Sequence, residues 1–180
     1  MADPTTQSRD VPQPYSPDHV GRIVHAWQRE RPDLDVSPQA IIGRLHRLAA
    51  ALTDELVPVY REHGLGEGEF DVLATLRRAG APFEHQPSEL AQHTMVTSGA
   101  MTKRIDRLES AGLVTRRASA ADGRARVVAL TDAGRKLIDR AFTRHIANEH
   151  RLLEPLSASD RAQLECILTA WLGAVESASA

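Results

Sequence analysis

The chain has 180 residues, of which 42% are hydrophobic and only 4% aromatic, and its formal net charge is −2. This length is enough for one domain with a core, or for a small domain with dimerisation arms, and no apolar run reaches the roughly 18 residues that a membrane span needs. The single cysteine excludes an internal disulfide framework and predicts a reducing, cytoplasmic location.

The chain is predicted to begin with a tail and a short helix. Residues 1–17 contain four prolines and no long apolar stretch, which is typical of a disordered tail and not of a signal peptide. Residues 18–29 carry apolar side chains at helical spacing, the last of them Trp27, and Pro32 follows as a stop.

Two further helices are predicted before residue 80. The first is long: Ser37 is its N-cap, and residues 63–66 close it with two glycines. Pro58 lies inside this helix and predicts a kink or an early end near Val57. The second helix covers 67–79 and has an apolar side.

A short helix at 87–92, a turn at 93–96 and a helix from Ser98 onward come next. At about 100° per residue, the apolar positions of the helix that begins at Ser98 fall within about 60° of one another around its axis. This predicted buried seam consists of Met101, Ile105, Leu108 and Gly112, the last of which ends the helix. Polar residues face away from it: Thr102, Lys103, Asp106 and Arg107.

A basic β-ribbon follows this helix. Its first strand carries Arg116 and Arg117, a glycine turn holds Arg124, and the second strand covers 126–130. Residues 96–126 have seven basic and three acidic side chains, a net charge of +4, which leaves −6 for the rest of the chain. A basic island on an acidic body indicates one DNA-binding surface, although a solvated charged face is the alternative.

Two helices are predicted to complete the chain. One opens at 131–134 and stops at Pro155, and the other starts at 157–160 with a capping pattern. Cys166 lies among leucine and isoleucine in the last helix, which predicts a buried packing thiol and not a redox sensor. Because the helices outside 66–130 lack a compact body of their own, we expect them to pack against a second copy in an obligate homodimer.

The predicted order α-α-α-α-α-β-β-α-α describes a mainly α protein with a small β-wing. A helix followed by a basic ribbon is how a winged helix-turn-helix binds DNA. We expect N-terminal helices at 18–62, a winged helix-turn-helix domain at 63–130 and C-terminal dimerisation helices at 131–180. The expected contacts to a pseudo-palindromic operator are Ser98, Gly99, Thr102, Lys103, Arg107, Arg124 and Arg126.

These residues resemble the MarR family of bacterial winged-helix regulators over roughly residues 38–175. The resemblance depends on five segments, at 88–91, 98–109, 112–114, 122–124 and 130–134. It implies a homodimer on a roughly palindromic operator and, usually, repression that a small anionic or phenolic ligand relieves.

A narrower likeness is to the urate-responsive branch of the family, the HucR and PecS kind of regulator. The additional N-terminal helix with its tryptophan, and segments at 64–65, 69–74 and 76–80, carry this likeness. It implies four ligand-binding side chains: Trp27, Asp71, Arg104 and Arg116. An aromatic plane with two guanidinium groups suits a flat, anionic heteroaromatic molecule such as urate.

Each of these four residues also has a structural alternative. Trp27 would pack the additional helix, Asp71 would be a helix-start or surface acid, and Arg104 would form a salt bridge. Arg104 lies on the shoulder of the seam, about 60° from Met101, where a charge needs a partner. If a ligand anion made Asp71, Arg104 and Arg116 change partners, the helix that carries Arg104 would shift.

Other classes of protein have weaker support. The chain has no Gly-rich phosphate loop, no nucleophile elbow and no persuasive pair of carboxylates, so we expect neither an enzyme nor a cofactor. No metal site is expected, since His145 and His150 are five residues apart and do not share a helix face. Two alternatives stay open: a constitutive dimeric DNA-binding protein without a ligand, and a sensor of another phenolic or organic acid.

Overall fold

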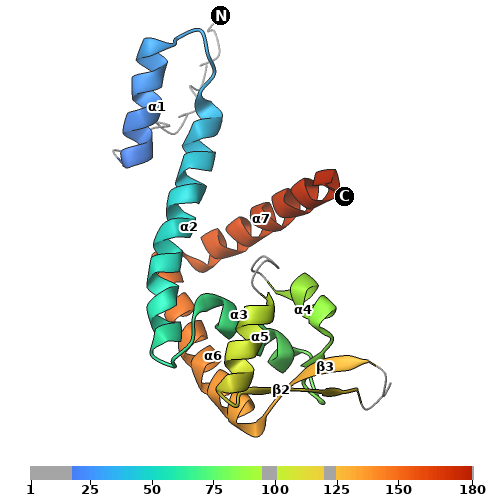
Figure 1. Ribbon diagram of the computed structural model, residues 1–180. Helices are drawn as coiled ribbons and strands as arrows, with labels where there is room; N and C mark the ends of the chain where they lie inside the picture. Colours follow the sequence, from blue (N-terminus) through green and yellow to red (C-terminus); the bar gives the residue numbers. More distant parts are fainter. Residues whose placement is uncertain (1–17, 95–100, 120–124, 180) are drawn as a thin grey trace, which may run out of the picture. The chain divides into compact units, whose positions relative to one another are not determined.

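The structure, a computed structural model, describes residues 18–94, 101–119 and 125–179 (Figure 1). The tail expected at 1–17 lies outside the described residues. The chain divides into two units, residues 1–53 and 54–180. Within the described ranges, no helix has the length and apolar character needed to cross a membrane.

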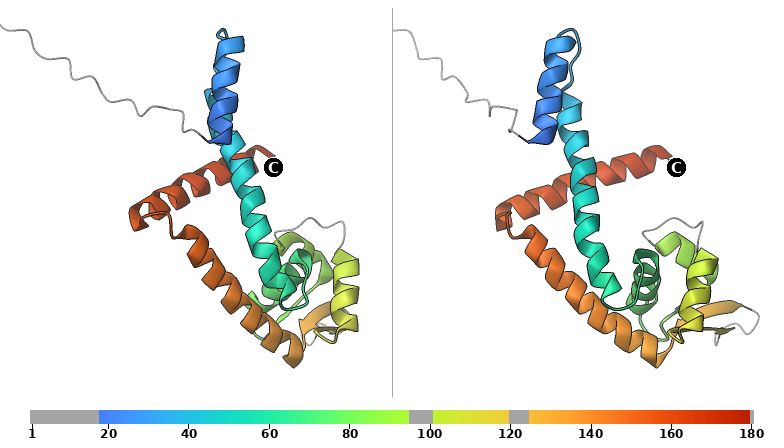
Figure 2. Two further views of the ribbon diagram at one scale, coloured as in Figure 1. Left: turned by 90° about the vertical axis from the view of Figure 1, so that its left-hand side faces the viewer. Right: turned by 60° about the vertical axis from the view of Figure 1, so that its left-hand side comes forward.

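The first unit contains α1 (His19–Glu30) and the first part of α2 (Ser37–Arg61), which lie side by side in both views of Figure 2. Asp18 caps α1 and also pairs with Arg44 of α2 at 2.8 Å. Val24 of α1 is fully buried. A cap, an ion pair and an apolar contact therefore hold the additional helix against α2.

The second unit contains the end of α2 and all later elements. These are α3 (Glu67–Arg78), β1 (Glu84–His85), α4 (Pro87–His93), α5 (Met101–Ser110), β2 (Val114–Ala118), β3 (Arg126–Leu130), α6 (Asp132–Leu153) and α7 (Ala158–Ser179). The strands form an antiparallel sheet in the order β1-β3-β2. The fold class is as predicted, but β1 was not expected, because a two-residue strand is too short to show an alternating pattern.

The central element of the second unit is α3. Every residue from Phe70 to Leu76 is buried, whereas the sequence pattern predicted one apolar side. The reason is that α4, α5, α6 and β3 all pack on this helix. Leu73 and Leu76 are among the largest fully buried side chains, together with Leu90 of α4. The core of the unit therefore lies around α3.

The end of α2 lies directly before the closing residues predicted at 63–66, and not near Val57. The helix continues through Pro58 to Arg61, so the early end expected near Val57 is wrong. Tyr60 supplies the reason, because the residue is only 6% exposed and its ring stacks on Phe70 with 4.2 Å between ring centroids. This burial stabilises the last turn beyond the proline. The chain then turns at Gly64, whose φ of 72° lies in the left-handed region.

The buried phenol of Tyr60 is expected to make stability depend on alkaline pH. Burial, followed by the negative charges of Glu149, Glu67 and Asp71, raises the pKa of Tyr60 to about 12 from 10.0. Because the folded-state pKa is the higher one, the stabilisation by Tyr60 is complete below pH 10 and is lost as pH rises from about 10 to 12. Urea denaturation should show a fall in the free energy of unfolding over this interval, of about 1–2 kcal/mol more in the wild type than in Tyr60→Phe. An equal fall in both proteins would show that ionisation of Tyr60 does not cause the loss of stability.

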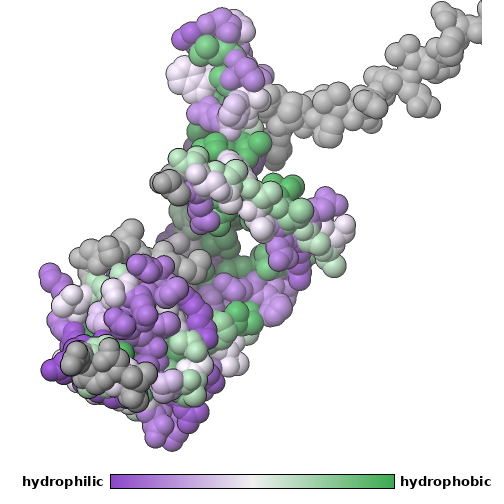
Figure 3. Space-filling view, turned by 90° about the vertical axis from the view of Figure 1, so that its right-hand side faces the viewer, coloured by the Kyte–Doolittle hydropathy of each residue, from purple (hydrophilic) through white to green (hydrophobic). Residues whose placement is uncertain are grey.

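Several large apolar side chains stay uncovered in the single chain, and hydrophobic surface is visible in Figure 3. They concentrate on α2 and α7, where the most exposed are Ile41, Leu48, Ile167, Leu172 and Val175. None of residues 158–178 in α7 is buried. Cys166 is accordingly exposed, so the prediction of a buried thiol is wrong for the single chain, because none of the described elements buries this part of α7.

Candidate nucleic-acid interface

The helix α5 has one buried and one exposed side. Met101, Ile105 and Leu108 are 6%, 2% and 2% exposed, which confirms these three members of the predicted seam. The fourth, Gly112, is exposed, because α5 ends at Ser110 and Gly112 lies in the turn after it. The residues predicted to face away from the seam are all exposed: Thr102, Lys103, Asp106 and Arg107. The helix therefore packs through one side and exposes a mostly cationic side to solvent. Two further predicted contacts, Ser98 and Gly99, lie outside the described residues.

A hairpin of β2 and β3 lies beside α5 (Figure 1). Its strand pairs run from Val114 opposite Leu130 to Ala118 opposite Arg126, as two five-residue strands. Arg126 is exposed at the first position of β3. Arg124, predicted to sit in that turn, lies outside the described residues. The described part of the hairpin has the position of a wing.

The end of α5 is joined tightly to the beginning of α6. Gly112, with a φ of 70°, turns the chain after the helix. The Thr131 hydroxyl donates to the Gly112 carbonyl at 2.7 Å and accepts the N–H of Gly134 at 3.0 Å, which caps α6. A Cβ on Gly134 would lie 2.0 Å from the carbonyl oxygen of Leu113. Only glycine therefore allows this close approach of α6 to the base of the wing.

Two arginines of α5 reach the first turn of α3. Arg107 pairs with Glu69 at 3.0 Å, yet its side chain stays 72% exposed. Arg104 is half-buried and lies against Gly68, where an added Cβ would be 2.2 Å from Arg104 Nε. The predicted shoulder position of Arg104 is thus the side of α5 that faces α3. Sequence reasoning missed Glu69 and Gly68, because their distance along the chain from α5 leaves no local signal.

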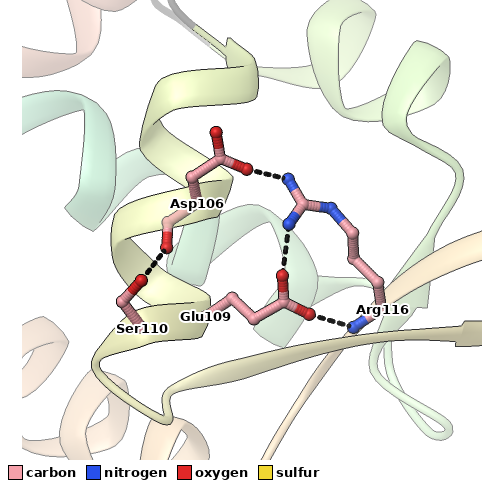
Figure 4. Close-up of polar contacts among 4 residues, drawn as sticks. All are labelled: Asp106, Glu109, Ser110 and Arg116. Atoms are coloured by element: carbon pink, nitrogen blue, oxygen red, sulfur yellow. Dashed lines mark hydrogen bonds and ion pairs between the residues drawn. The ribbon is translucent and has the colours of Figure 1, made fainter.

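Arg116 connects β2 to α5 (Figure 4). Its guanidinium donates to the carboxylates of Asp106 and Glu109, and its backbone N–H donates to Glu109 Oε1 at 2.9 Å. The hydrogen bond that Arg116 donates to Asp106 is the largest of the interactions that raise the pKa of Arg116, and the Glu109 carboxylate adds to it. The sequence offered one signal for these partners, namely two acids and a basic residue on either side of the Gly112 turn.

Three of the four expected ligand-binding residues lie in the second unit. Asp71 is 8% exposed on α3, one turn after Gly68, so it is not a surface acid. Arg104 reaches the same helix from α5. The acids that hold Arg116 project from α5 about 140–160° away from Arg104. The structure therefore brings Arg104 to the helix of Asp71 and holds Arg116 on another side of α5.

The fourth expected residue, Trp27, belongs to the first unit. This residue is 48% exposed. It borders a recess of about 380 Å³ that is also lined by Leu34, Val36 and Pro38. This exposure leaves part of the indole open to a planar molecule.

These elements together define a winged helix-turn-helix: α4, then α5 with a cationic exposed side, then a basic hairpin. The model of the MarR family matches residues 63–125. The chain is also 40% identical over 149 residues to the HTH-type transcriptional regulator PecS of Dickeya dadantii, which covers 83% of this chain and 90% of that protein. The chain belongs to the MarR family and is a transcriptional regulator of the MarR type.

Solved structures have the same fold. Rv2887 of Mycobacterium tuberculosis, in complex with salicylic acid, is 33% identical with a TM-score of 0.56, over 71% of this chain and 92% of that chain. Sco3205 of Streptomyces coelicolor, in complex with DNA, has a TM-score of 0.69 over 79% of this chain and 93% of that chain. Its identity is 22%, so this second likeness shows the fold alone. Transcriptional regulation, the role of the relatives, is not an enzymatic one.

Proposed function

We propose that this protein is a ligand-responsive transcriptional repressor that binds duplex DNA through α5 and the wing. One observation carries the proposal: Lys103 and Arg107 are exposed on the side of α5 opposite a fully packed seam. They can therefore contact phosphates and base edges in a major groove without any change in the core. The full set of proposed contacts is Ser98, Gly99, Thr102, Lys103, Arg107, Arg124 and Arg126. Curated relatives that are 34% identical are repressors by name, which favours repression.

The acting species in this proposal is a homodimer. Exposed apolar side chains on α2 and α7, such as Ile41 and Ile167, would be covered by a second copy. The dimerisation arms are 18–62 and 131–180, and the DNA-binding domain is 63–130. A twofold dimer would place its two α5 helices in successive major grooves of a pseudo-palindromic operator, about 34–36 Å apart.

The proposed ligand is a small anionic heteroaromatic molecule such as urate, bound by Trp27, Asp71, Arg104 and Arg116. Arg116 would first have to leave Asp106 and Glu109, which hold it on another side of α5. Guanidinium groups hold carboxylates and related anions through paired hydrogen bonds, and an indole face stacks on a flat ring. The complex of Rv2887 with salicylic acid supports an aromatic anion as the general class. Arg104 would couple the ligand to DNA, because it belongs to α5 and lies against α3.

The proposal is tested by measuring DNA binding with and without urate. Duplex DNA selected by the wild-type protein from a random-sequence pool serves as the operator, and fluorescence anisotropy reports binding. Urate should release the wild type, and Arg104→Ala should need at least about tenfold more urate. Arg140→Ala, which removes an exposed arginine from α6, is the control and should behave as the wild type.

Each other outcome has a distinct meaning. If Arg104→Ala leaves the DNA at the wild-type concentration of urate, Arg104 does not couple the two sites. Release by salicylate and not by urate would replace urate with a phenolic acid as the ligand. A protein that binds selected DNA but responds to neither compound, in release or in thermal melting, would be a constitutive DNA-binding protein.

A further inference from the structure

Two acids lie where the proposed DNA surface should be positive. Asp106 is 55% exposed and projects between Thr102 and Lys103 around the axis of α5. Glu109, one turn closer to the end of the helix, is 38% exposed. A carboxylate beside the phosphates of DNA would be repelled and would cancel part of the attraction of Lys103. The helix therefore needs a compensating cation at this position.

Arg116 supplies that cation from the wing. Its guanidinium contacts both carboxylates at once, one nitrogen on each acid (Figure 4). Its backbone N–H bonds to Glu109 as well, so the contact holds the strand and not only the side chain. On the neighbouring strand Arg116 lies opposite Val128, which is fully buried. The base of the contact is therefore fixed by the packed part of the hairpin.

We propose that Arg116 is a positioning residue for DNA binding, which neutralises Asp106 and Glu109 and fixes the wing against α5. We call these three residues the Arg116 clamp. The clamp joins helix and wing into one cationic surface, and Arg116 itself does not need to touch DNA. The hydrogen bonds of Arg116 are charge-assisted. Because its side chain is only partly exposed, water screens these interactions less than it would at the open surface.

A consequence for regulation rests on the function proposed above, in which an anion recruits Arg116. When the guanidinium turns to the ligand, Asp106 and Glu109 lose their counter-charge and two carboxylates face the phosphates. The ligand would then release DNA by changing the charge of the surface, in addition to any shift of α5.

A double-mutant cycle on ligand-free protein tests the clamp. Arg116→Gln should weaken binding to the selected operator at least about tenfold. Asp106→Asn with Glu109→Gln should recover most of this loss in the Arg116→Gln protein, yet change wild-type affinity less than about threefold. This non-additivity is the signature of a direct coupling. Additive effects, or wild-type affinity in Arg116→Gln, would overturn the proposal.

The matched control is Arg117→Gln. It removes the same charge from the neighbouring position of the same strand, but Arg117 pairs with Glu84 of β1 and not with α5. Its affinity should fall less than that of Arg116→Gln, and Asp106→Asn with Glu109→Gln should not rescue it. Equal rescue of both arginine variants would mean that total charge alone decides binding, and would overturn the clamp. Thermal melting of all variants shows whether each one is folded. A misfolded wing would not regain operator affinity when Asp106 and Glu109 are also replaced, so this recovery distinguishes a lost clamp from a misfolded wing.

The regulatory step is tested separately with urate as the probe. Asp106→Asn with Glu109→Gln should bind urate at least as tightly as the wild type by calorimetry, because Arg116 no longer has to leave the two acids, but should need at least about tenfold more urate to leave the operator. Release at the wild-type concentration would overturn the charge step. If urate binds neither protein, the proposed ligand is wrong, while the ligand-free cycle still decides whether the clamp exists.

Discussion

Replacing both Lys103 and Arg107 with alanine should weaken binding to the selected operator by about 100-fold or more. Each well-placed cationic contact in a DNA groove is worth about 1–3 kcal/mol, and a tenfold change in affinity corresponds to about 1.4 kcal/mol. If both side chains contact phosphates, the slope of log affinity against log salt concentration should also fall by about 2. Fluorescence anisotropy at several salt concentrations measures both quantities.

A second pair of basic residues provides the control. Lys136 and Arg140 are exposed on α6, four positions apart like Lys103 and Arg107. Their replacement removes the same charge and should reduce affinity less than about threefold. Because Arg107 also pairs with Glu69, Lys103→Ala alone is needed as well, and about a tenfold loss is expected. Equal losses from the α5 and α6 pairs would show that DNA is not bound through α5.

The substitution Gly134→Ala should lower the free energy of unfolding by about 3 kcal/mol. The added Cβ would lie 2.0 Å from the carbonyl oxygen of Leu113, which is backbone and cannot rotate away. Either α6 or the turn after α5 must then move, and the bond from Gly134 to Thr131 would be strained. Urea denaturation measures the loss, and DNA affinity should fall with it, because this junction holds the end of α5.

The control for Gly134 is a helical glycine with open surroundings. Gly173 lies in α7, and a Cβ there would meet nothing within 4 Å. Alanine at this position should leave stability unchanged or raise it by up to about 1 kcal/mol, through its higher helix propensity. If Gly134→Ala were as stable as Gly173→Ala, the close approach at Leu113 would not be a feature of the folded protein.

Much of the local structure was predictable from short-range patterns. The seam of Met101, Ile105 and Leu108 follows from helical periodicity, and the structure buries all three. The strand at 126–130 and the helix that Thr131 caps were predicted at the bounds observed. The position of Arg104 at the shoulder of the seam was also predictable. These features are determined by side chains within a few residues of one another, whose effect does not depend on the rest of the fold.

The contacts that connect the elements were not predictable in the same way. Local patterns left open whether α2 continues past Pro58, and they did not show that α3 is buried on all sides or that Cys166 stays exposed in the single chain. In each case a neighbour remote in sequence, or the absence of one, outweighed the local preference.

The candidate site shows the same division. The amino-acid sequence by itself determined the cationic side of α5, the wing strands and membership of the MarR family. Only the tertiary structure decided that Arg104 lies against Gly68 and that Arg116 holds Asp106 and Glu109. The physical reason is that an ion pair or a close backbone approach depends on where two segments meet in space, whereas periodicity and capping act within one segment.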